Sequence, residues 1–475
     1  MKKKVIIFFL CIFLSGCSKK IATNKSTTIK DNTKTLSLKT STKSSVISTT
    51  SINTTKTILT SKTTLLTTKE LEYTNPYNIS LSLTANDNEL AIHFETKKDV
   101  KAHIEYRLVG VEEYTSSETK ESVFMIKKRE YYFGETVLKN LVNSAYEYRL
   151  VDESGNVLTK NQIFNFGPIN KDYFTFMILP DAQENWEYGY KIHANSVKNA
   201  LKNTDTLDLV MAPGDLINDG LIKDQYNWFF TYSSDFILNV PFMSTPGNHE
   251  HLTSDPETNV FKAHFSFPQN GPTIESFENK EVDLEKTYSF NYSNVHFTVI
   301  NSDVFCGGEG TCSAENDEVR VNRTLEWIEN DFKNSSKEFL IVMLHRGPYS
   351  KSYNSLKVRE ALVPLFEKYN VDLVISGHDH AYSRSVVKDG NLVDFASLDF
   401  YDYRSETGVT YLVSNTTTSK FYGGKKNSGI ETNFSFIDEV NVIPLVTVYD
   451  DYIKVVSYKV LDTDNGVLEE FYIRK

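Results

Sequence analysis

The chain has 475 residues, with 51 Lys and Arg against 62 Asp and Glu, and its formal net charge is −11. This length exceeds that of one ordinary compact domain, so we expect two. The acidic balance argues against a protein that wraps nucleic acid, because such a protein needs a basic face to displace condensed counterions.

The charge is unevenly distributed along the chain. Residues 1–20 contain five Lys and no acidic residue, and residues 21–70 contain eight Lys and two acidic residues. Residues 71–475 therefore carry a formal charge of −22. A basic leader and tether precede a strongly acidic body.

The first 16 residues are predicted to be a signal peptide. Three Lys at positions 2–4 precede an apolar stretch at 5–14, which is shorter than the ~20 residues that span a bilayer as a helix. The following Leu14-Ser15-Gly16-Cys17 is similar to the bacterial lipobox. That resemblance implies a lipidated Cys17, a membrane anchor, and a location on the outer face of the bacterial cytoplasmic membrane or cell envelope. An ordinary signal peptide with an incidental Cys is the alternative.

Residues 17–74 are rich in Ser, Thr, Lys and Asn. This composition cannot bury enough apolar surface to offset chain entropy, so we predict a disordered tether after Cys17.

Residues 75–168 show short alternating runs separated by polar turns, which favours a small all-β sandwich. The runs lie at 79–83, 89–95, 101–107, 130–132, 146–151 and 162–166. Residues 137–141 and 146–150 resemble the late strands of fibronectin type III-like domains of the immunoglobulin-like class.

Residues 169–475 are predicted to form a second domain of the α/β or α+β class. Apolar strands are expected at 174–179, 207–212, 240–244, 296–300, 339–344 and 371–375, and helices at 190–201, 325–332 and 355–369. Apolar strands that alternate with helices indicate a sheet covered on its faces. Chemistry in such sheets lies beyond the carboxyl ends of the strands.

Potential metal ligands follow five of these strands. They are Asp181, Asp215, Asn248, His345, His378 and His380, with His249 beside Asn248. Two Asp, one Asn and three His form an oxygen and nitrogen ligand set for two divalent or trivalent ions. Two cations about 3.5–4 Å apart need a bridging carboxylate between them.

Five short sequence motifs resemble, in the same order along the chain, those of the calcineurin-like metallophosphoesterase superfamily. The motifs are Pro180-Asp181-Ala182-Gln183, Gly214-Asp215, Gly247-Asn248-His249-Glu250, Met343-Leu344-His345 and Gly377-His378-Asp379-His380. The upstream β-sandwich and the segments 381–384 and 408–414 are similar to purple acid phosphatases. The resemblance covers about 75–475 and implies a four-layer αββα sandwich after the fibronectin-like one.

The resemblance also implies roles for these residues. Asp181, Asp215 and His380 would hold one metal, and Asp215, Asn248, His345 and His378 the other, with Fe, Zn or Mn as the ions. His249 would contact the phosphate. The implied reaction is hydrolysis of phosphomonoesters by a metal-bound hydroxide. Purple enzymes have a Tyr three residues after the bridging Asp, and Asn218 stands there, so we expect a colourless protein.

Several neighbouring residues have two interpretations. Arg346 follows His345, and its guanidinium suits a phosphate, but it could instead pair with Asp379 or Glu250. Gln183, Asn218 and Arg384 could support the ligands or serve only the local structure.

The folded part contains two cysteines, which are too few for a disulfide framework or a Cys-based zinc site. In an exported chain, a disulfide between Cys306 and Cys312 is expected, and free thiols are the alternative.

The sequence allows two other functions. The metal ligands do not determine the third ester position of the substrate, so a phosphodiesterase or nucleotide hydrolase of the same superfamily is an alternative. A non-catalytic surface-binding lipoprotein is the other. The sequence does not identify a partner of the β-sandwich.

Overall fold

The computed structural model describes residues 77–169, 171–251, 255, 257–307, 317–422, 430–460 and 466–475. The predicted signal peptide, Cys17, the tether and Cys312 lie outside these residues. Within the described ranges, none of the helices combines the length and apolarity that a membrane span requires.

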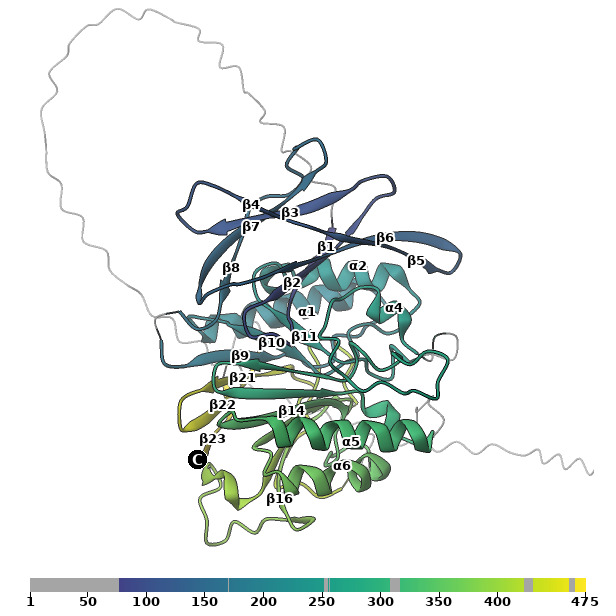
Figure 1. Ribbon diagram of the computed structural model, residues 1–475. Coiled ribbons are helices and arrows are strands. Elements are labelled where there is room, and N and C mark those ends of the chain that lie inside the picture. Colours follow the sequence, from purple (N-terminus) through teal and green to yellow (C-terminus); the bar gives the residue numbers. More distant parts are fainter. Residues whose placement is uncertain are drawn as a thin grey trace, which may run out of the picture. The chain divides into compact units, whose positions relative to one another are not determined.

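The N-terminal part of the described chain is a sandwich of two four-stranded antiparallel sheets (Figure 1). One sheet has the order β1 (Tyr77–Leu83), β2 (Leu90–Thr96), β6 (Arg129–Leu138) and β5 (Lys120–Ile126). The other has the order β4 (Thr115–Ser117), β3 (Ala102–Leu108), β7 (Ser144–Asp152) and β8 (Gln162–Phe166). In β7, Tyr146, Tyr148 and Leu150 alternate into the core, as a period of two requires. The predicted fibronectin-like sandwich is confirmed, and β4 and β5 were not predicted.

The C-terminal part contains two larger sheets. The first has the order β11 (Phe242–Ser244), β10 (Leu209–Ala212), β9 (Phe174–Ile178), β21 (Val442–Val448), β22 (Tyr452–Lys459), β23 (Val467–Arg474) and β18 (Asp402–Arg404). The second has the order β12 (Tyr288–Tyr292), β13 (Val295–Ile300), β14 (Phe339–Arg346), β15 (Leu373–Gly377), β19 (Val409–Val413), β16 (Tyr382–Lys388) and β17 (Asn391–Leu392), and β20 (Phe434–Phe436) pairs with β16.

Aromatic side chains join the two sheets face to face. The Phe174 ring lies 4.8 Å from that of Tyr292, and the Phe176 ring lies 5.7 Å from that of Phe297. Phe174 and Phe176 belong to β9 in the first sheet, whereas Tyr292 and Phe297 belong to the second. The apolar faces of the sheets therefore form one shared core.

Helices cover the outer face of each sheet (Figure 1). α1 (Glu187–Ala200) and α2 (Lys223–Tyr232) cover the first sheet, and α5 (Glu318–Asn334) and α6 (Leu356–Lys368) cover the second. The remaining short helices are η1 (Leu201–Asn203), α3 (Ser234–Ile237), α4 (Asn259–Lys262), η2 (Ser302–Phe305) and η3 (Ser405–Thr407). The predicted αββα arrangement is confirmed. Sequence periodicity missed α2 and the hairpins β21 to β23.

A buried ion pair joins the sandwich to the layer of α1 and α2. Lys223 Nζ of α2 lies 2.7 Å from Glu95 Oε2 of β2, and Glu95 also accepts hydrogen bonds from Tyr77 and Asn78. Tyr148 donates to the carbonyl oxygen of Leu238 across the same boundary. These contacts fix the sandwich against the C-terminal domain.

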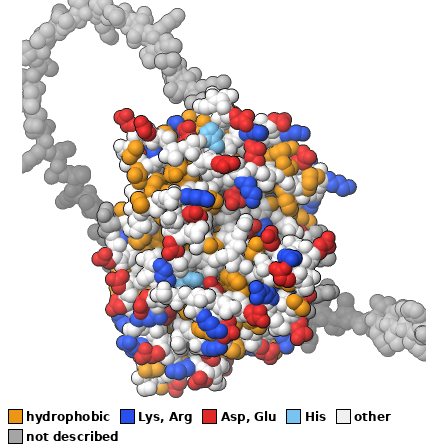
Figure 2. Space-filling view, viewed as in Figure 1, with side chains coloured by type: hydrophobic (Ala, Val, Ile, Leu, Met, Phe, Trp, Pro, Cys, Tyr) orange, Lys and Arg blue, Asp and Glu red, His pale blue; other side chains and the backbone are white. Residues whose placement is uncertain are grey.

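Charged side chains of both signs are mixed on one face of the molecule. On the face shown in Figure 2, Asp and Glu lie among Lys and Arg. An anionic ligand therefore depends on charges close to its binding site rather than on the net charge of the body.

Candidate metal centre

The six predicted ligand residues come from both sheets. Asp181, Asp215 and Asn248 follow β9, β10 and β11, which are parallel neighbours in the first sheet. His345 lies at the end of β14, and His378 and His380 follow β15, the parallel neighbour of β14 in the second sheet. Because parallel strands end at the same edge of a sheet, each sheet delivers its three side chains to one edge.

The side chains form two groups that share one carboxylate. Asp215, His345 and His378 make up one group, and Asp181, Asp215 and His380 the other, with the ligand atoms of each group within 4.8 Å of one another. All five residues are buried. A shared carboxylate between two ligand groups is what a pair of neighbouring cations requires.

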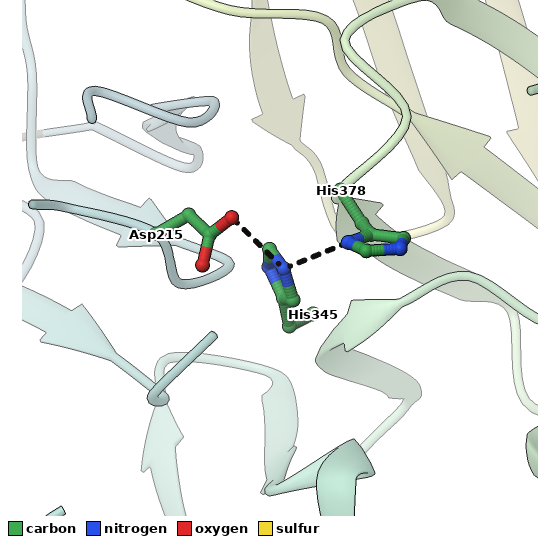
Figure 3. Close-up of side chains that lie close together, drawn as sticks. All are labelled: Asp215, His345 and His378. Atoms are coloured by element: carbon green, nitrogen blue, oxygen red, sulfur yellow. Dashed lines mark hydrogen bonds and ion pairs between the residues drawn. The ribbon is translucent and has the colours of Figure 1, made fainter. Parts of the chain in front are cut away.

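His345 is the centre of the first group (Figure 3). Its Nε2 atom lies 3.3 Å from Asp215 Oδ2 and 3.2 Å from His378 Nδ1. Asn248 Oδ1 lies 3.1 Å from the same nitrogen. In the second group, His380 Nε2 lies 3.7 Å from Asp181 Oδ1. The structure thus brings together all six residues predicted as ligands.

Three of these residues have left-handed backbone conformations. The φ angles are +52° at Asp215, +70° at His378 and +49° at His380. Each such angle in a non-glycine residue costs about 1–3 kcal/mol and persists only where the surroundings hold it. The backbone N–H of His378 donates to Asp181 Oδ1 at 3.0 Å, and that of Asp215 donates to Glu250 Oε2 at 3.0 Å. The loop that carries His378 and His380 is therefore strained, and the hydrogen bond to Asp181 holds it.

Two glycines allow the carboxylates to lie against the backbone. A Cβ atom at Gly247 would overlap with Asp215 Oδ1, and one at Gly377 would overlap with Asp181 Oδ2. Glu250 supports the same region, because its carboxylate also accepts the backbone N–H groups of Gly247 and Leu216. Burial, together with nearby Asp215, raises the pKa of Glu250 to about 7.

Two imidazoles are oriented by backbone carbonyls. His345 Nδ1 donates to the carbonyl oxygen of Pro213 at 2.8 Å, and His380 Nδ1 donates to that of Lys420. In a neutral imidazole, donation from Nδ1 leaves Nε2 as the nitrogen with a free lone pair. Both Nε2 atoms face the carboxylate groups.

Burial and neighbouring charges shift the pKa values of the cluster. Burial raises the pKa of Asp181 well above its ordinary value. Burial also opposes ionisation of Asp215, but His345 and His249 hold the pKa of this carboxyl well below the usual range. Burial lowers the pKa of His345, but Asp215 and Asp181 together outweigh this effect and raise the pKa to about 9. Two buried carboxylates beside neutral nitrogen donors fit cations, which would replace the proton on His345.

His249 and Gln183 contact the shared carboxylate, and Asn218 contacts His249. The backbone N–H of His249 donates to Asp215 Oδ1 at 2.9 Å, and its Nδ1 donates to the carbonyl oxygen of Asn218 at 2.7 Å. Gln183 Nε2 donates to Asp215 Oδ2 at 2.7 Å and lies 2.9 Å from His380 Nε2. Burial lowers the pKa of His249.

Arg346 lies at the centre, but its partner differs from both carboxylates considered above. Its Nε donates to Asp303 Oδ1 at 2.6 Å, and its Nη1 donates to His378 Nε2 at 3.2 Å. Asp379 instead accepts from Ser350 and from the backbone of Ser352. Of the two interpretations of Arg346, the pairing with Asp379 or Glu250 is not what the structure shows, because η2 carries Asp303 to the end of β14.

Arg384 belongs to a different cluster, which agrees with the second of its two interpretations, a role in the local structure. Its guanidinium donates to Glu469 on β23, at 2.8 Å from Nη2 and 3.0 Å from Nε. Tyr382, two residues earlier on β16, donates to the same carboxylate. The period of two along β16 turns both side chains to one face, where they serve the fold.

Sequence reasoning missed three side chains at the centre. The Tyr422 ring stacks on His380 at 4.1 Å, and the Tyr353 ring lies 4.5 Å from that of His378. Lys420 donates to Gln183 and Asn218. They lie in loops with no motif of their own, and only the chain fold brings them to the site.

Cys306 is disulfide-bonded. Cys312, its expected partner, lies outside the described residues.

Several known proteins are similar to this chain in sequence or in fold. Residues 174–382 match the family model described as calcineurin-like phosphoesterase. The chain is 25% identical over 276 residues to probable purple acid phosphatase 20 of Arabidopsis thaliana, with 52% of this chain and 59% of that relative covered. It is 23% identical over 351 residues to acid phosphatase type 7 of Danio rerio, with 66% of this chain and 71% of the relative covered. The chain thus spans less than two thirds of the plant relative's length.

A solved structure shares the fold. The purple acid phosphatase from yellow lupin (Lupinus luteus) seeds matches with a TM-score of 0.68 at 19% identity, covering 84% of this chain and 74% of that one. Residues 174–382 therefore form a calcineurin-like phosphoesterase domain, and the chain has the fold of the purple acid phosphatases.

Proposed function

We propose that this protein is a metal-dependent phosphatase that hydrolyses phosphomonoesters at a centre of two metal ions. The observation that carries the proposal is the sharing of Asp215 by two buried ligand groups. Asp181, Asp215 and His380 would hold one ion, and Asp215, Asn248, His345 and His378 the other. Their Asp, Asn and His donors suit Fe, Zn or Mn.

Two bound cations would lower the pKa of a coordinated water to about 7 and offset negative charge on the phosphoryl oxygens. The chain itself contributes orientation and proton transfer. The Nδ1–H of His249 is held by Asn218, which leaves Nε2 to exchange a proton with the leaving oxygen. Gln183 fixes Asp215 through an amide hydrogen bond. Arg346 is held by Asp303 beside His378.

Comparison of p-nitrophenyl phosphate with bis-p-nitrophenyl phosphate tests the reaction. We expect metal-dependent turnover with a higher kcat/KM for the monoester. A preference for the diester would favour the phosphodiesterase or nucleotide hydrolase alternative. Turnover of neither ester by protein that contains two metals per chain would favour a non-catalytic binding lipoprotein.

The colour of the protein tests the metal environment. Asn218 donates to Asn185 and accepts from Lys420, and an amide supplies no phenolate to ferric iron. We expect the metal-loaded protein to be colourless. Strong visible absorption of pure, metal-loaded protein would contradict this expectation.

The proposed location is the outer face of the bacterial cytoplasmic membrane, through a lipid on Cys17. The basic leader and the segment Leu14-Ser15-Gly16-Cys17 support it. The Cys17→Ser variant should move from the membrane fraction to the soluble exported fraction. An unchanged membrane fraction would contradict lipid anchoring at this residue.

A further inference from the structure

Gln225 lies on α2 and reaches the loop that holds His249. The residue is 2% exposed, and its Oε1 atom accepts the backbone N–H groups of Asn218 at 2.8 Å and of Asp219 at 2.9 Å. The carbonyl oxygen of Asn218 in turn accepts from His249 Nδ1 at 2.7 Å. A buried amide of the helix is therefore one peptide away from the imidazole expected to contact phosphate.

Two of these hydrogen bonds meet on the same peptide unit. The carbonyl of Asn218 and the N–H of Asp219 belong to one peptide, and in a trans peptide these groups point in opposite directions. His249 binds the carbonyl end of the unit, and Gln225 binds the N–H end. Rotation of this peptide would break both bonds at once, so the acceptor on Gln225 holds the carbonyl in place for His249.

The direction of this carbonyl decides which way the His249 imidazole faces. A carbonyl oxygen can only accept, so Nδ1 donates and Nε2 keeps a lone pair in the neutral ring. The same loop also holds the backbone of His249, because the N–H of Gly220 donates to the carbonyl oxygen of His249 at 3.1 Å. Without the acceptor of Gln225, the peptide would be free to turn, and His249 Nδ1 would lose its partner.

The side chain of Gln225 is not used to cap its own helix. A glutamine at the third position of a helix often accepts or donates at the first turn, where it satisfies the backbone of the residue before the helix. Gln225 stands at this position of α2, which begins at Lys223. However, the N–H of the preceding Ile222 donates to the carbonyl oxygen of Asp219 at 2.9 Å. The amide of Gln225 therefore serves the loop beside His249.

Neighbouring residues fix α2 on both sides of Gln225. Lys223 pairs with Glu95 of the sandwich at 2.7 Å, and the Tyr226 ring stacks on that of His264 at 3.8 Å. A side chain that orients a site must itself be held by packing and by hydrogen bonds. These contacts give Gln225 a fixed position from which it can orient the loop.

Resting on the phosphatase function proposed above, we propose that Gln225 is a positioning residue of the reaction. It holds the peptide between Asn218 and Asp219, and through this peptide it keeps the imidazole of His249 directed at the phosphate. Gln225 is not expected to touch the substrate, so its effect on the reaction passes through His249. Its removal should therefore weaken phosphate binding and turnover only while His249 is present.

The test uses the full metal-loaded chain and five variants. Gln225→Met removes the acceptor and keeps an unbranched side chain, and Gln225→Glu keeps the acceptor. His249→Ala, alone and combined with Gln225→Met, completes a double-mutant cycle. Asn433→Leu is the matched control, because Asn433 Oδ1 accepts the backbone N–H of Val386 at 2.7 Å on β16. Metal content, binding of inorganic phosphate by calorimetry, and kcat/KM for p-nitrophenyl phosphate are measured for each.

We expect Gln225→Met to retain two metals per chain, because the six predicted ligands are unchanged. Its kcat/KM should fall by about tenfold to 100-fold, as expected when a side chain at the reaction loses its orientation, and its phosphate affinity should fall as well. Gln225→Glu should recover most of both losses, since its carboxylate can accept the same two N–H groups. The double variant should lose no more than His249→Ala. Asn433→Leu should match the wild type in phosphate affinity and kcat/KM.

Unchanged phosphate affinity and turnover in Gln225→Met would overturn the assignment, as would loss of metal in that variant. Losses that multiply in the double variant, or an equal loss in Asn433→Leu, would show a purely structural role and would also overturn it. Wild type that binds phosphate with an affinity dependent on both Gln225 and His249 but does not hydrolyse the ester would overturn the phosphatase function and leave the positioning role supported. Wild type that binds no phosphate would overturn both.

Discussion

The metal centre and the cluster around Arg384 both bury charge in the same domain, but they balance it differently. Arg384 and Glu469 form an ion pair at 2.8 Å, and the guanidinium also lies 3.9 Å from the centre of the Phe400 ring. At the metal centre, Asp181 and Asp215 are buried close together with His residues. The Arg384 cluster contains its own counter-ion. The metal centre instead holds two carboxylates but only one imidazole with a raised pKa, His345, so we expect it to take up cations.

Because of this difference, we expect the Arg384 cluster to stabilise the fold and the metal centre to bind ions. Breaking a buried ion pair leaves an uncompensated charge and destabilises the fold. Removing one carboxylate from the metal centre instead removes a metal ligand, so we expect metal binding to be lost. Each region therefore predicts a different response to substitution.

The largest expected effect is that of Asp215→Asn. Because Asp215 belongs to both ligand groups, its loss should reduce the metal content to below one ion per chain and lower turnover by at least about 100-fold. Elemental analysis and p-nitrophenyl phosphate hydrolysis measure these effects. A variant that retains two metals would contradict the shared role of Asp215.

Arg384→Met should act on stability. It leaves the buried Glu469 carboxylate without its ion-pair partner, so the free energy of unfolding should fall by about 3–5 kcal/mol, as measured by urea denaturation. The folded variant should still bind two metals. Adding Glu469→Gln should recover part of the lost stability. Loss of metal with unchanged stability would place Arg384 at the metal centre after all.

Chelation should destabilise the wild type and the Arg384 variant to a similar extent. Each ion that binds only the folded state contributes about 3 kcal/mol when its free concentration is 100 times the Kd. Thermal denaturation with and without chelator measures this shift. Asp215→Asn should show little shift. A full shift in that variant would mean that the stabilising ions bind elsewhere.

Glu285 lies between the Arg384 cluster and the metal centre in how its charge is balanced. It is partly buried, and its Oε2 atom lies 3.7 Å from Lys262 Nζ. Burial raises the pKa of Glu285 to about 7, and Glu135 of β6 adds to the rise. Between about pH 4.5 and 7, the Glu285 carboxyl therefore keeps its proton in the folded state and loses it in the unfolded state. The stability that protonation of Glu285 confers on the fold is lost as pH rises through that window.

Glu285→Gln should remove this pH dependence. Relative to the wild type, the variant should gain at most about 3 kcal/mol between pH 5 and pH 7.5. Urea unfolding at the two pH values checks this. The same difference between variant and wild type at both pH values would show that Glu285 ionises normally in the folded state.

The sequence was most informative where a ligand directly follows an apolar strand. Asp181, Asp215 and Asn248 could be located because β9, β10 and β11 are short, buried and parallel. The fold class followed from the same alternation of apolar strands and helices. In contrast, α2 was missed, because its apolar periodicity is weak and its buried face includes Lys223 and Gln225.

The sequence by itself determined the identity of the six ligand candidates and the order of the layers, because both depend on local patterns along the chain. Only the tertiary structure distinguished Arg346 from Arg384, since their roles depend on Asp303 and Glu469, which are 43 and 85 residues away. It also brought Lys420 to Gln183 across 237 residues. Contacts over such distances are set by how the two sheets pack, and local periodicity carries no record of them.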